Sequence, residues 1–142
     1  MPYPAAVRMV RLILMLVMAT GAACSREPVF LDDRAGILRP AEQERITRLS
    51  RRLLADLDIQ IRTVVLAEPA TDIDAAAVAI FAQERLGAHT HGARGLLFLV
   101  DPAGARVRLE VGYDLEGIFT DAVVGRVERT QMAPFFAAGR VG

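Results

Sequence analysis

Acidic side chains gather just after the most strand-like segment of the sequence. Asp114, Glu116 and Asp121 lie close together in the chain, and Asp33 is a fourth acid that the fold could bring to them. Carboxylate oxygens are the ligands that Ca²⁺ and Mg²⁺ prefer, and a metal held there could polarise a phosphate ester. The pattern favours a calcium or magnesium site at a sheet edge, where strands end and helices begin. The alternative is that Asp121 supports a helix start and the other acids are solvated loop residues.

Other reaction types find little support in the residues. The sequence has no nucleophile elbow, P-loop, HExxH or CxxC motif. The serines after Cys24 are Ser25 and Ser50, of which the first lies in a predicted tether and the second on a predicted helix. His89 and His91 share a predicted loop, but a metal would need two more ligands, so we interpret them as exposed loop residues. An enzyme of this sequence would work with carboxylates, a metal and water.

The first residues have the three parts of a signal peptide. Arg8 and Arg11 precede an apolar run at residues 12–19, and small residues follow. This arrangement predicts a signal peptide over residues 1–23, because the apolar run is too short to cross a bilayer. We therefore expect the mature protein in the periplasm or cell envelope.

Cys24 follows the small residues directly and precedes a tether at residues 24–28. The position resembles a bacterial lipobox, in which Cys24 would be lipidated, although Gly21 stands where Leu is usual. The alternative is ordinary signal peptidase cleavage, which leaves a free thiol at the new N-terminus. A single cysteine excludes an internal disulfide.

The composition argues against nucleic-acid binding. All 17 basic residues of the 142-residue chain are arginine. Two of them lie in the predicted signal peptide, so the remaining 15 face 17 acidic residues, a net charge of −2. A slightly acidic chain without a basic run is not typical of a nucleic-acid partner. Its length fits one domain, predicted at residues 29–142.

The elements that would position the acids centre on a hairpin. Residues 96–100 form an unbroken apolar run, which is typical of a strand covered on both faces. Residues 101–104, Asp-Pro-Ala-Gly, predict a type I turn. Apolar and charged side chains then alternate over residues 106–111, which predicts a half-solvated strand paired antiparallel to the first.

A first helix is predicted to begin at Pro40. Its predicted buried side is an apolar stripe, and its other side carries arginines that we interpret as a solvated face. The stripe comprises Ile46, Leu49, Leu53 and Leu57, and the arginines are Arg45, Arg48, Arg51 and Arg52. We expect ion pairs between Glu44 and Arg48 and between Arg52 and Asp56, four residues apart.

The remaining segments alternate strand and helix. Residues 59–66 predict a strand, and Asp72 or Asp74 can cap a helix that continues to about residue 86, with Gly87 as its left-handed stop. Strand, helix and strand in this order predict a right-handed βαβ unit. Thr120 can cap a third helix that continues to about residue 132.

Four segments together resemble a known family. They are DRAGIL before the first helix, the strand GLLFLVD, the segment RVRLEVGYDLEGIFTDA, and the ending PFFAAGRVG. The chain from residue 29 to residue 142 resembles the TPM domain, a family named for thylakoid lumen and photosystem repair proteins and a receptor-modulating protein. The resemblance implies a three-layer α/β/α sandwich with a small mixed β-sheet and an extracytoplasmic position. Through members that resemble weak acid phosphatases and bind calcium, the resemblance also implies phosphatase activity and calcium binding as expectations for this chain.

The chain departs from the family pattern in two ways. Members commonly have Gly where this chain has Asp114, and their domains continue into another helix and, in many bacteria, into membrane spans. We therefore expect the domain to lack its last helix, as a fragment or truncated gene would. A missing helix that covers on the order of 300 Å² of apolar sheet would forfeit several kcal/mol, unless a partner covers that face.

These patterns predict a non-catalytic accessory domain that binds membrane-protein partners in the cell envelope. Its membrane association would come from a lipid anchor or a missing C-terminal span. The alternative is a weak divalent-metal-dependent acid phosphatase that uses the carboxylate cluster.

Overall fold

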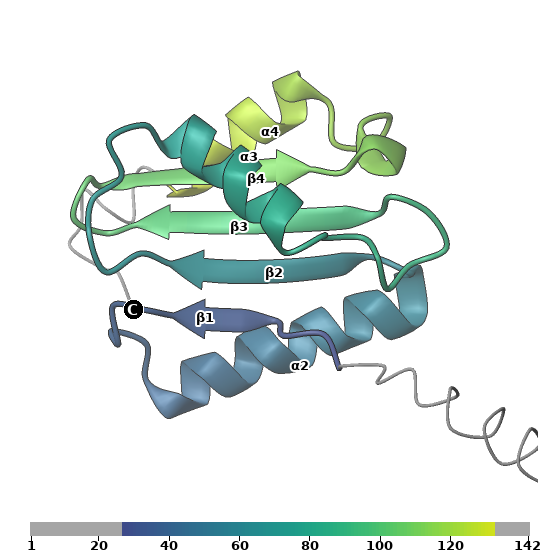
Figure 1. Ribbon diagram of the computed structural model, residues 1–142, viewed down its shortest axis with the longest axis horizontal. Coiled ribbons are helices and arrows are strands. Elements are labelled where there is room, and N and C mark those ends of the chain that lie inside the picture. Colours follow the sequence, from purple (N-terminus) through teal and green to yellow (C-terminus); the bar gives the residue numbers. More distant parts are fainter. Residues whose placement is uncertain (1–26, 133–142) are drawn as a thin grey trace, which may run out of the picture.

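The computed structural model describes residues 27–132, which form one mixed four-stranded sheet (Figure 1). The strands are β1 (Leu31–Asp33), β2 (Gln60–Val65), β3 (Gly95–Asp101) and β4 (Arg106–Val111), and they lie side by side in chain order. The first three strands are parallel, whereas β4 runs antiparallel to β3. The C-terminal end of β4 therefore lies at the N-terminal end of β3.

Helices complete the layers on the two faces of this sheet. They are α2 (Pro40–Leu57), α3 (Ile73–Gln83) and α4 (Asp121–Val127), with a short 3₁₀ turn η2 (Tyr113–Leu115) after β4 and a π-helical turn η3 (Glu128–Met132) after α4. The predicted α/β fold with a small mixed sheet is confirmed.

The strand β3 is covered on both faces, as its unbroken apolar run predicts. Leu97 and Leu99 are fully buried against α3, where Ala77 is also fully buried because its small side chain lets the helix lie close to the sheet. On the other face Leu96 packs with Ile59 and Leu115. Each face of the sheet therefore has its own apolar core.

The buried side of α2 differs from the predicted stripe. Leu49 and Leu57 are 58% and 55% exposed, whereas Ser50 is the buried residue of this helix and its hydroxyl donates to the carbonyl oxygen of Ile46 at 2.9 Å. Leu53 stays half-buried in the core around Leu96. The prediction of Leu49 and Leu57 as core residues was wrong because the helix turns its small serine toward the sheet, which allows a close approach.

The helix starts agree with the sequence, but one helix end does not. Pro40 opens α2, and the carboxylate of Asp72 caps α3 by accepting from the backbone N–H groups of Asp74 and Ala75, both at 3.0 Å. Gly87 has a left-handed φ of 95°, yet α3 has already ended at Gln83.

The described residues include no helix that is both long and apolar enough to cross a membrane. The predicted signal peptide, Cys24 and the ending PFFAAGRVG lie outside the described residues. The predicted signal peptide and lipidation of Cys24 therefore stay predictions.

Candidate functional site

Residues 112–120, which we call the post-hairpin loop, leave β4 through a glycine that has no room for a side chain. The N–H of Gly112 donates to the carbonyl oxygen of Gly95 at 2.8 Å. A Cβ on Gly112 would overlap the carbonyl oxygen of Ala93 and lie 2.9 Å from the backbone nitrogen of Gly95. The sequence therefore needs glycine here because two backbone segments touch.

Two further contacts hold the post-hairpin loop against the domain. Leu115 is fully buried in the core with Ile59 and Leu96. The carboxylate Oδ2 of Asp114 accepts from the N–H of Ala93 at 3.0 Å. The buried side chain of Leu115 and the hydrogen bond of Asp114 thus hold the loop against the domain. Its exposed side chains therefore lie in defined positions.

The outer side of the post-hairpin loop presents large apolar side chains to solvent. Tyr113 is 78% exposed and Ile118 is 61% exposed, although both neighbour the buried anchor Leu115 in sequence. Val123, on the adjoining first turn of α4, is 42% exposed. An aromatic and two aliphatic side chains on a fixed segment are typical of the anchors found in protein interfaces.

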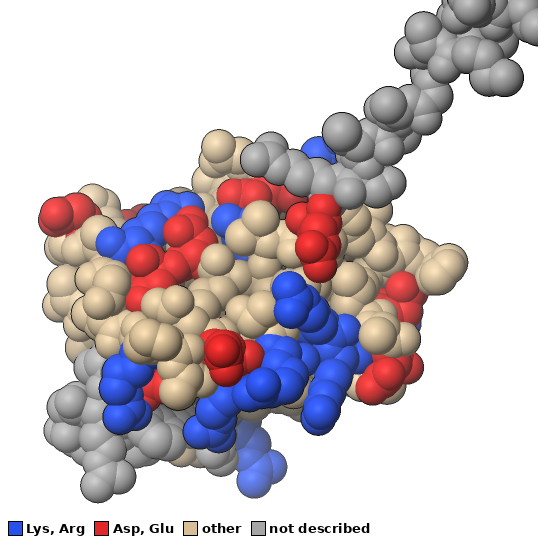
Figure 2. Space-filling model, turned by 90° about the horizontal axis from the view of Figure 1, so that it is seen from below, with Lys and Arg blue, Asp and Glu red and all other residues tan. Residues whose placement is uncertain are grey.

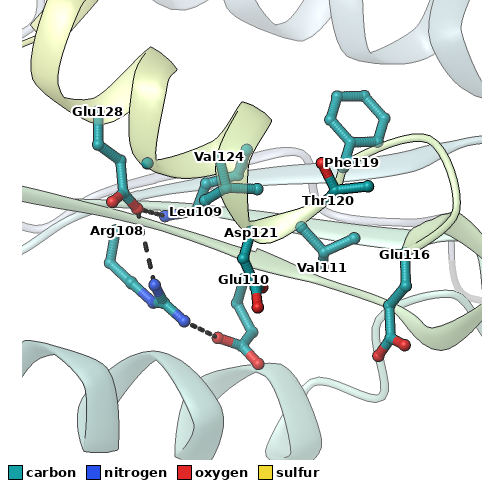
Figure 3. Close-up of a pocket in the computed structure, with 11 residues that line it drawn as sticks. Arg108, Leu109, Glu110, Val111, Glu116, Phe119, Thr120, Asp121, Val124 and Glu128 are labelled. Carbon is teal, nitrogen blue, oxygen red and sulfur yellow. Dashed lines mark hydrogen bonds and ion pairs between the residues drawn. The ribbon is translucent and has the colours of Figure 1, made fainter.

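Two of the predicted acids line a groove beside the edge strand β4. Glu116 and Asp121 border this groove, which has a volume of about 610 Å³ and lies between β4 and α4 (Figure 3). Val111 and Val124 supply part of its apolar lining. The groove is open to solvent, and its loop end carries negative charge.

At the other end of the groove, Arg108 forms ion pairs with three acids. Its guanidinium lies 3.3 Å from the carboxylate of Glu110, 3.8 Å from that of Glu128 and 3.2 Å from that of Asp74. Glu128 also accepts from the backbone N–H of Leu109 at 3.0 Å (Figure 3). The side chain of Glu128 thus accepts the hydrogen bond of a backbone N–H group on the edge strand β4, which limits pairing with another chain at that position.

Asp33 does not join the other three acids. Its carboxylate accepts from the N–H groups of Gly36 at 3.0 Å, Ile37 at 3.4 Å and Leu38 at 2.9 Å, so it closes the turn before α2. In the sheet register Asp33 is level with Val65, near the C-terminal ends of the parallel strands.

Asp114 follows β4 and therefore lies at the opposite end of the sheet from Asp33, because β4 is antiparallel. Within residues 27–132 no three His, Cys, Asp or Glu side chains are grouped so that they could hold a metal ion. The prediction that Asp33 could approach the acids after the hairpin was wrong, because the strand directions place it at the other end of the sheet. Glu116 and Asp121 remain together at one groove.

A family model described as the TPM domain, and named for a TPM phosphatase, matches residues 31–142. The chain belongs to the TPM domain family. Among solved structures, the N-terminal domain of a protein from P. gingivalis is similar, with a TM-score of 0.71 and 25% identity over 82% of this chain and 74% of that chain. Comparison with curated proteins gave no match.

The turn of this TPM domain's hairpin contains Asp101, which the sequence pattern predicts only as the first residue of the turn. Asp101 is fully buried, and its carboxylate accepts from the N–H of Gly104 at 2.7 Å, from the N–H of Ala70 at 3.2 Å and from the guanidinium of Arg106 at 2.7 Å. Burial alone opposes the charged form, but these donors outweigh it and hold the pKa of Asp101 below its ordinary value. The Asp-Pro-Ala-Gly turn predicts the hydrogen bond from Gly104 to Asp101. No local pattern in the sequence predicts the hydrogen bond from Ala70, which lies 31 residues earlier.

The histidine loop of the TPM domain is tied to the end of α2. The side chain of His91 is 96% exposed, and its Nδ1 lies 3.1 Å from the carboxylate of Asp58. The backbone N–H of His91 donates to the same carboxylate at 3.0 Å and lowers the pKa of Asp58. His89 is exposed, and its backbone N–H donates to the buried side-chain oxygen of Gln60 at 3.3 Å. These contacts give the loop a structural role.

Proposed function

We propose that this TPM domain is a non-catalytic binding module of the cell envelope and that it holds a membrane-protein partner through the post-hairpin loop. The observation that carries the proposal is the contrast within that loop. Leu115 is fully buried while Tyr113 and Ile118 are mostly exposed. A segment that is fixed in the free protein loses little conformational entropy on binding, so its exposed anchors are available for affinity.

The charges beside the anchors suggest the chemistry of the partner. Glu116 and Asp121 flank the exposed apolar side chains on the groove side, and both are themselves exposed. A partner with an apolar pocket rimmed by arginine or lysine would match this arrangement, because complementary charge steers association and fixes orientation. The expected location in the envelope rests on the predicted signal peptide.

Photocrosslinking in the source cells tests this function. A photoreactive residue placed at Ile118 of the full-length chain should give one defined adduct with a membrane protein. The same residue at Val78, which is 54% exposed on α3, is the matched control and should not give that adduct. Tyr113→Ala should weaken the interaction by about 2 kcal/mol, the size expected of an interface hot spot. The same adduct from both positions would contradict the proposal.

A weak acid phosphatase is the second candidate, because the matching family model is named for a phosphatase and Glu116 and Asp121 share one groove. Mg²⁺ is commonly bound by one or two carboxylates together with substrate phosphate oxygens. Carboxylates of this kind would hold the ion, and the ion would polarise the phosphate ester.

Phosphate release from a simple phosphomonoester distinguishes the two functions. The full-length chain is assayed with and without a chelator, next to Asp121→Asn and the control Asp56→Asn, which changes an exposed acid on α2. Turnover that needs the metal and is lost only in Asp121→Asn would replace the binding function with catalysis. Equal background release from all samples supports the binding module.

A further inference from the structure

The outer face of α2 carries four exposed arginines, which we call the arginine ridge. Successive members are three, three and one residues apart, so they share one broad side of the helix. Figure 2, which faces the α2 side of the molecule, shows a continuous band of basic side chains. The ridge consists of Arg45, Arg48, Arg51 and Arg52.

Among residues 27–132, Arg45, Arg48 and Arg52 form no ion pair within 4.0 Å. The expected ion pairs of Glu44 with Arg48 and of Arg52 with Asp56 do not form within 4.0 Å in the described part of the chain. Arg51 lies 3.8 Å from Glu27, and both side chains are mostly exposed. Glu44 and Asp56 lie on the same side of α2 and reduce its net charge. The guanidinium groups that have no close ion pair among the described residues are still available to an external anion.

The arginines on the sheet strands, in contrast, are paired with acids. Arg62 pairs with Glu84 at 3.3 Å, and Arg106 pairs with Asp101 at 2.7 Å. Arg108 contacts three acids, of which Glu110 and Glu128 line the groove and Asp74 belongs to α3. Because the chain as a whole has a formal net charge of zero, the ridge is a local excess and not the result of a basic composition.

An exposed leucine lies within the ridge. Leu49 is 58% exposed and lies four residues after Arg45 and three before Arg52, so it adjoins both on the helix surface. A helix that combines arginines with an exposed apolar side chain is typical of segments that lie on a lipid surface. The aliphatic stems of arginine can contact the interface while the guanidinium groups stay with the headgroups.

The chain enters the described domain at the same side of the molecule. Glu27 is the first described residue and is close to Arg51. Cys24, where lipidation is predicted, is three residues earlier, which limits the separation of their Cα atoms to about 11 Å. A lipid attached to Cys24 would therefore hold the ridge within reach of a bilayer surface.

We infer that the arginine ridge docks on a bilayer surface of anionic phospholipid, with Leu49 among the headgroups. This contact turns the outer face of α2 toward the membrane. The post-hairpin loop belongs to the opposite edge of the sheet from β1, since it follows β4, so the two surfaces are separate.

Vesicle flotation tests the docking surface with the full 142-residue chain. Two kinds of vesicle are compared, one of phosphatidylcholine alone and one in which about a third of the lipid is phosphatidylglycerol. The triple variant Arg45→Gln, Arg48→Gln, Arg52→Gln should lower partitioning onto the anionic vesicles about 100-fold, since each arginine near such a surface contributes about fivefold. Partitioning onto phosphatidylcholine, through the apolar N-terminal run, should be the same for wild type and variant.

Two further variants and a salt series complete the test. The triple lysine variant at the same positions should keep anionic binding. Arg85→Gln, Arg126→Gln, Arg129→Gln removes as much charge from exposed positions outside α2 and should change binding by less than about fivefold. Raising the salt from about 0.1 M to about 1 M should abolish the preference for anionic lipid. Equal losses in both glutamine variants, or stronger release by inorganic phosphate than by chloride at equal ionic strength, would overturn the proposal.

Discussion

At the turn of the β3–β4 hairpin Asp101 is fully buried, whereas at the open end Glu116 and Asp121 are exposed on a groove. The buried carboxylate has three donors within hydrogen-bond distance, two from the backbone and one from Arg106. The exposed carboxylates have no hydrogen bond or ion pair within residues 27–132. At the turn, the carboxylate of Asp101 therefore stabilises the fold. At the other end, the carboxylates of Glu116 and Asp121 are available to a ligand or partner.

The largest expected effect comes from removing the buried acid. Asp101→Ala should lower the free energy of unfolding by about 3–5 kcal/mol, because it removes the acceptor of two partly buried backbone N–H groups and the ion-pair partner of Arg106. Urea denaturation followed by circular dichroism measures the change. Asp121→Ala, at the other end of the hairpin, should change stability by less than about 1 kcal/mol. Equal losses of unfolding free energy in the two variants would contradict the different roles that we assign to the acids at the two ends of the hairpin.

The post-hairpin loop allows a second comparison between adjacent residues. Leu115→Ala should lower the free energy of unfolding by about 2–5 kcal/mol because it opens a cavity beside Ile59 and Leu96. Ile118→Ala should stay within about 0.5 kcal/mol, since its side chain is mostly exposed. Thermal unfolding of the two variants gives the comparison. A large loss in Ile118→Ala would mean that this side chain supports the fold instead of awaiting a partner.

A smaller effect concerns acid stability. The folded-state pKa of Asp101 is below its ordinary value of 3.8, so the charged carboxylate stabilises the fold at pH values above the unfolded-state pKa. That contribution is lost as the pH falls through the folded-state pKa. Wild type should therefore lose stability more steeply below about pH 4 than Asp101→Asn does. Parallel pH curves from urea denaturation would show that another group governs the acid transition.

Much of the fold follows from local patterns in the sequence. The apolar run of β3 predicts burial on both faces, and Leu96, Leu97 and Leu99 confirm it. The Asp-Pro-Ala-Gly turn predicts the hairpin, and Pro40 and Asp72 predict the starts of α2 and α3. These signals are readable because turn chemistry, capping and burial depend on neighbouring residues.

The candidate site was predicted only in part. Glu116 and Asp121 do share a groove, as their closeness in sequence suggests, and Asp114 anchors the same loop. Asp33 does not approach them, because the pairing of β1 with β2 sets it at the other end of the sheet. A three-residue strand has too little pattern of its own for the sequence to place it.

The sequence by itself indicated the family, the main strands and helices that follow Pro40, and the burial of β3 on both faces. Only the tertiary structure decided which acids meet, which side of α2 faces the sheet, and which arginines are left without acidic partners. The physical reason is that local patterns act over a few residues, within one turn or one pleat. The position of a charge relative to distant charges depends on strand direction and helix rotation, which are fixed by packing across the whole domain.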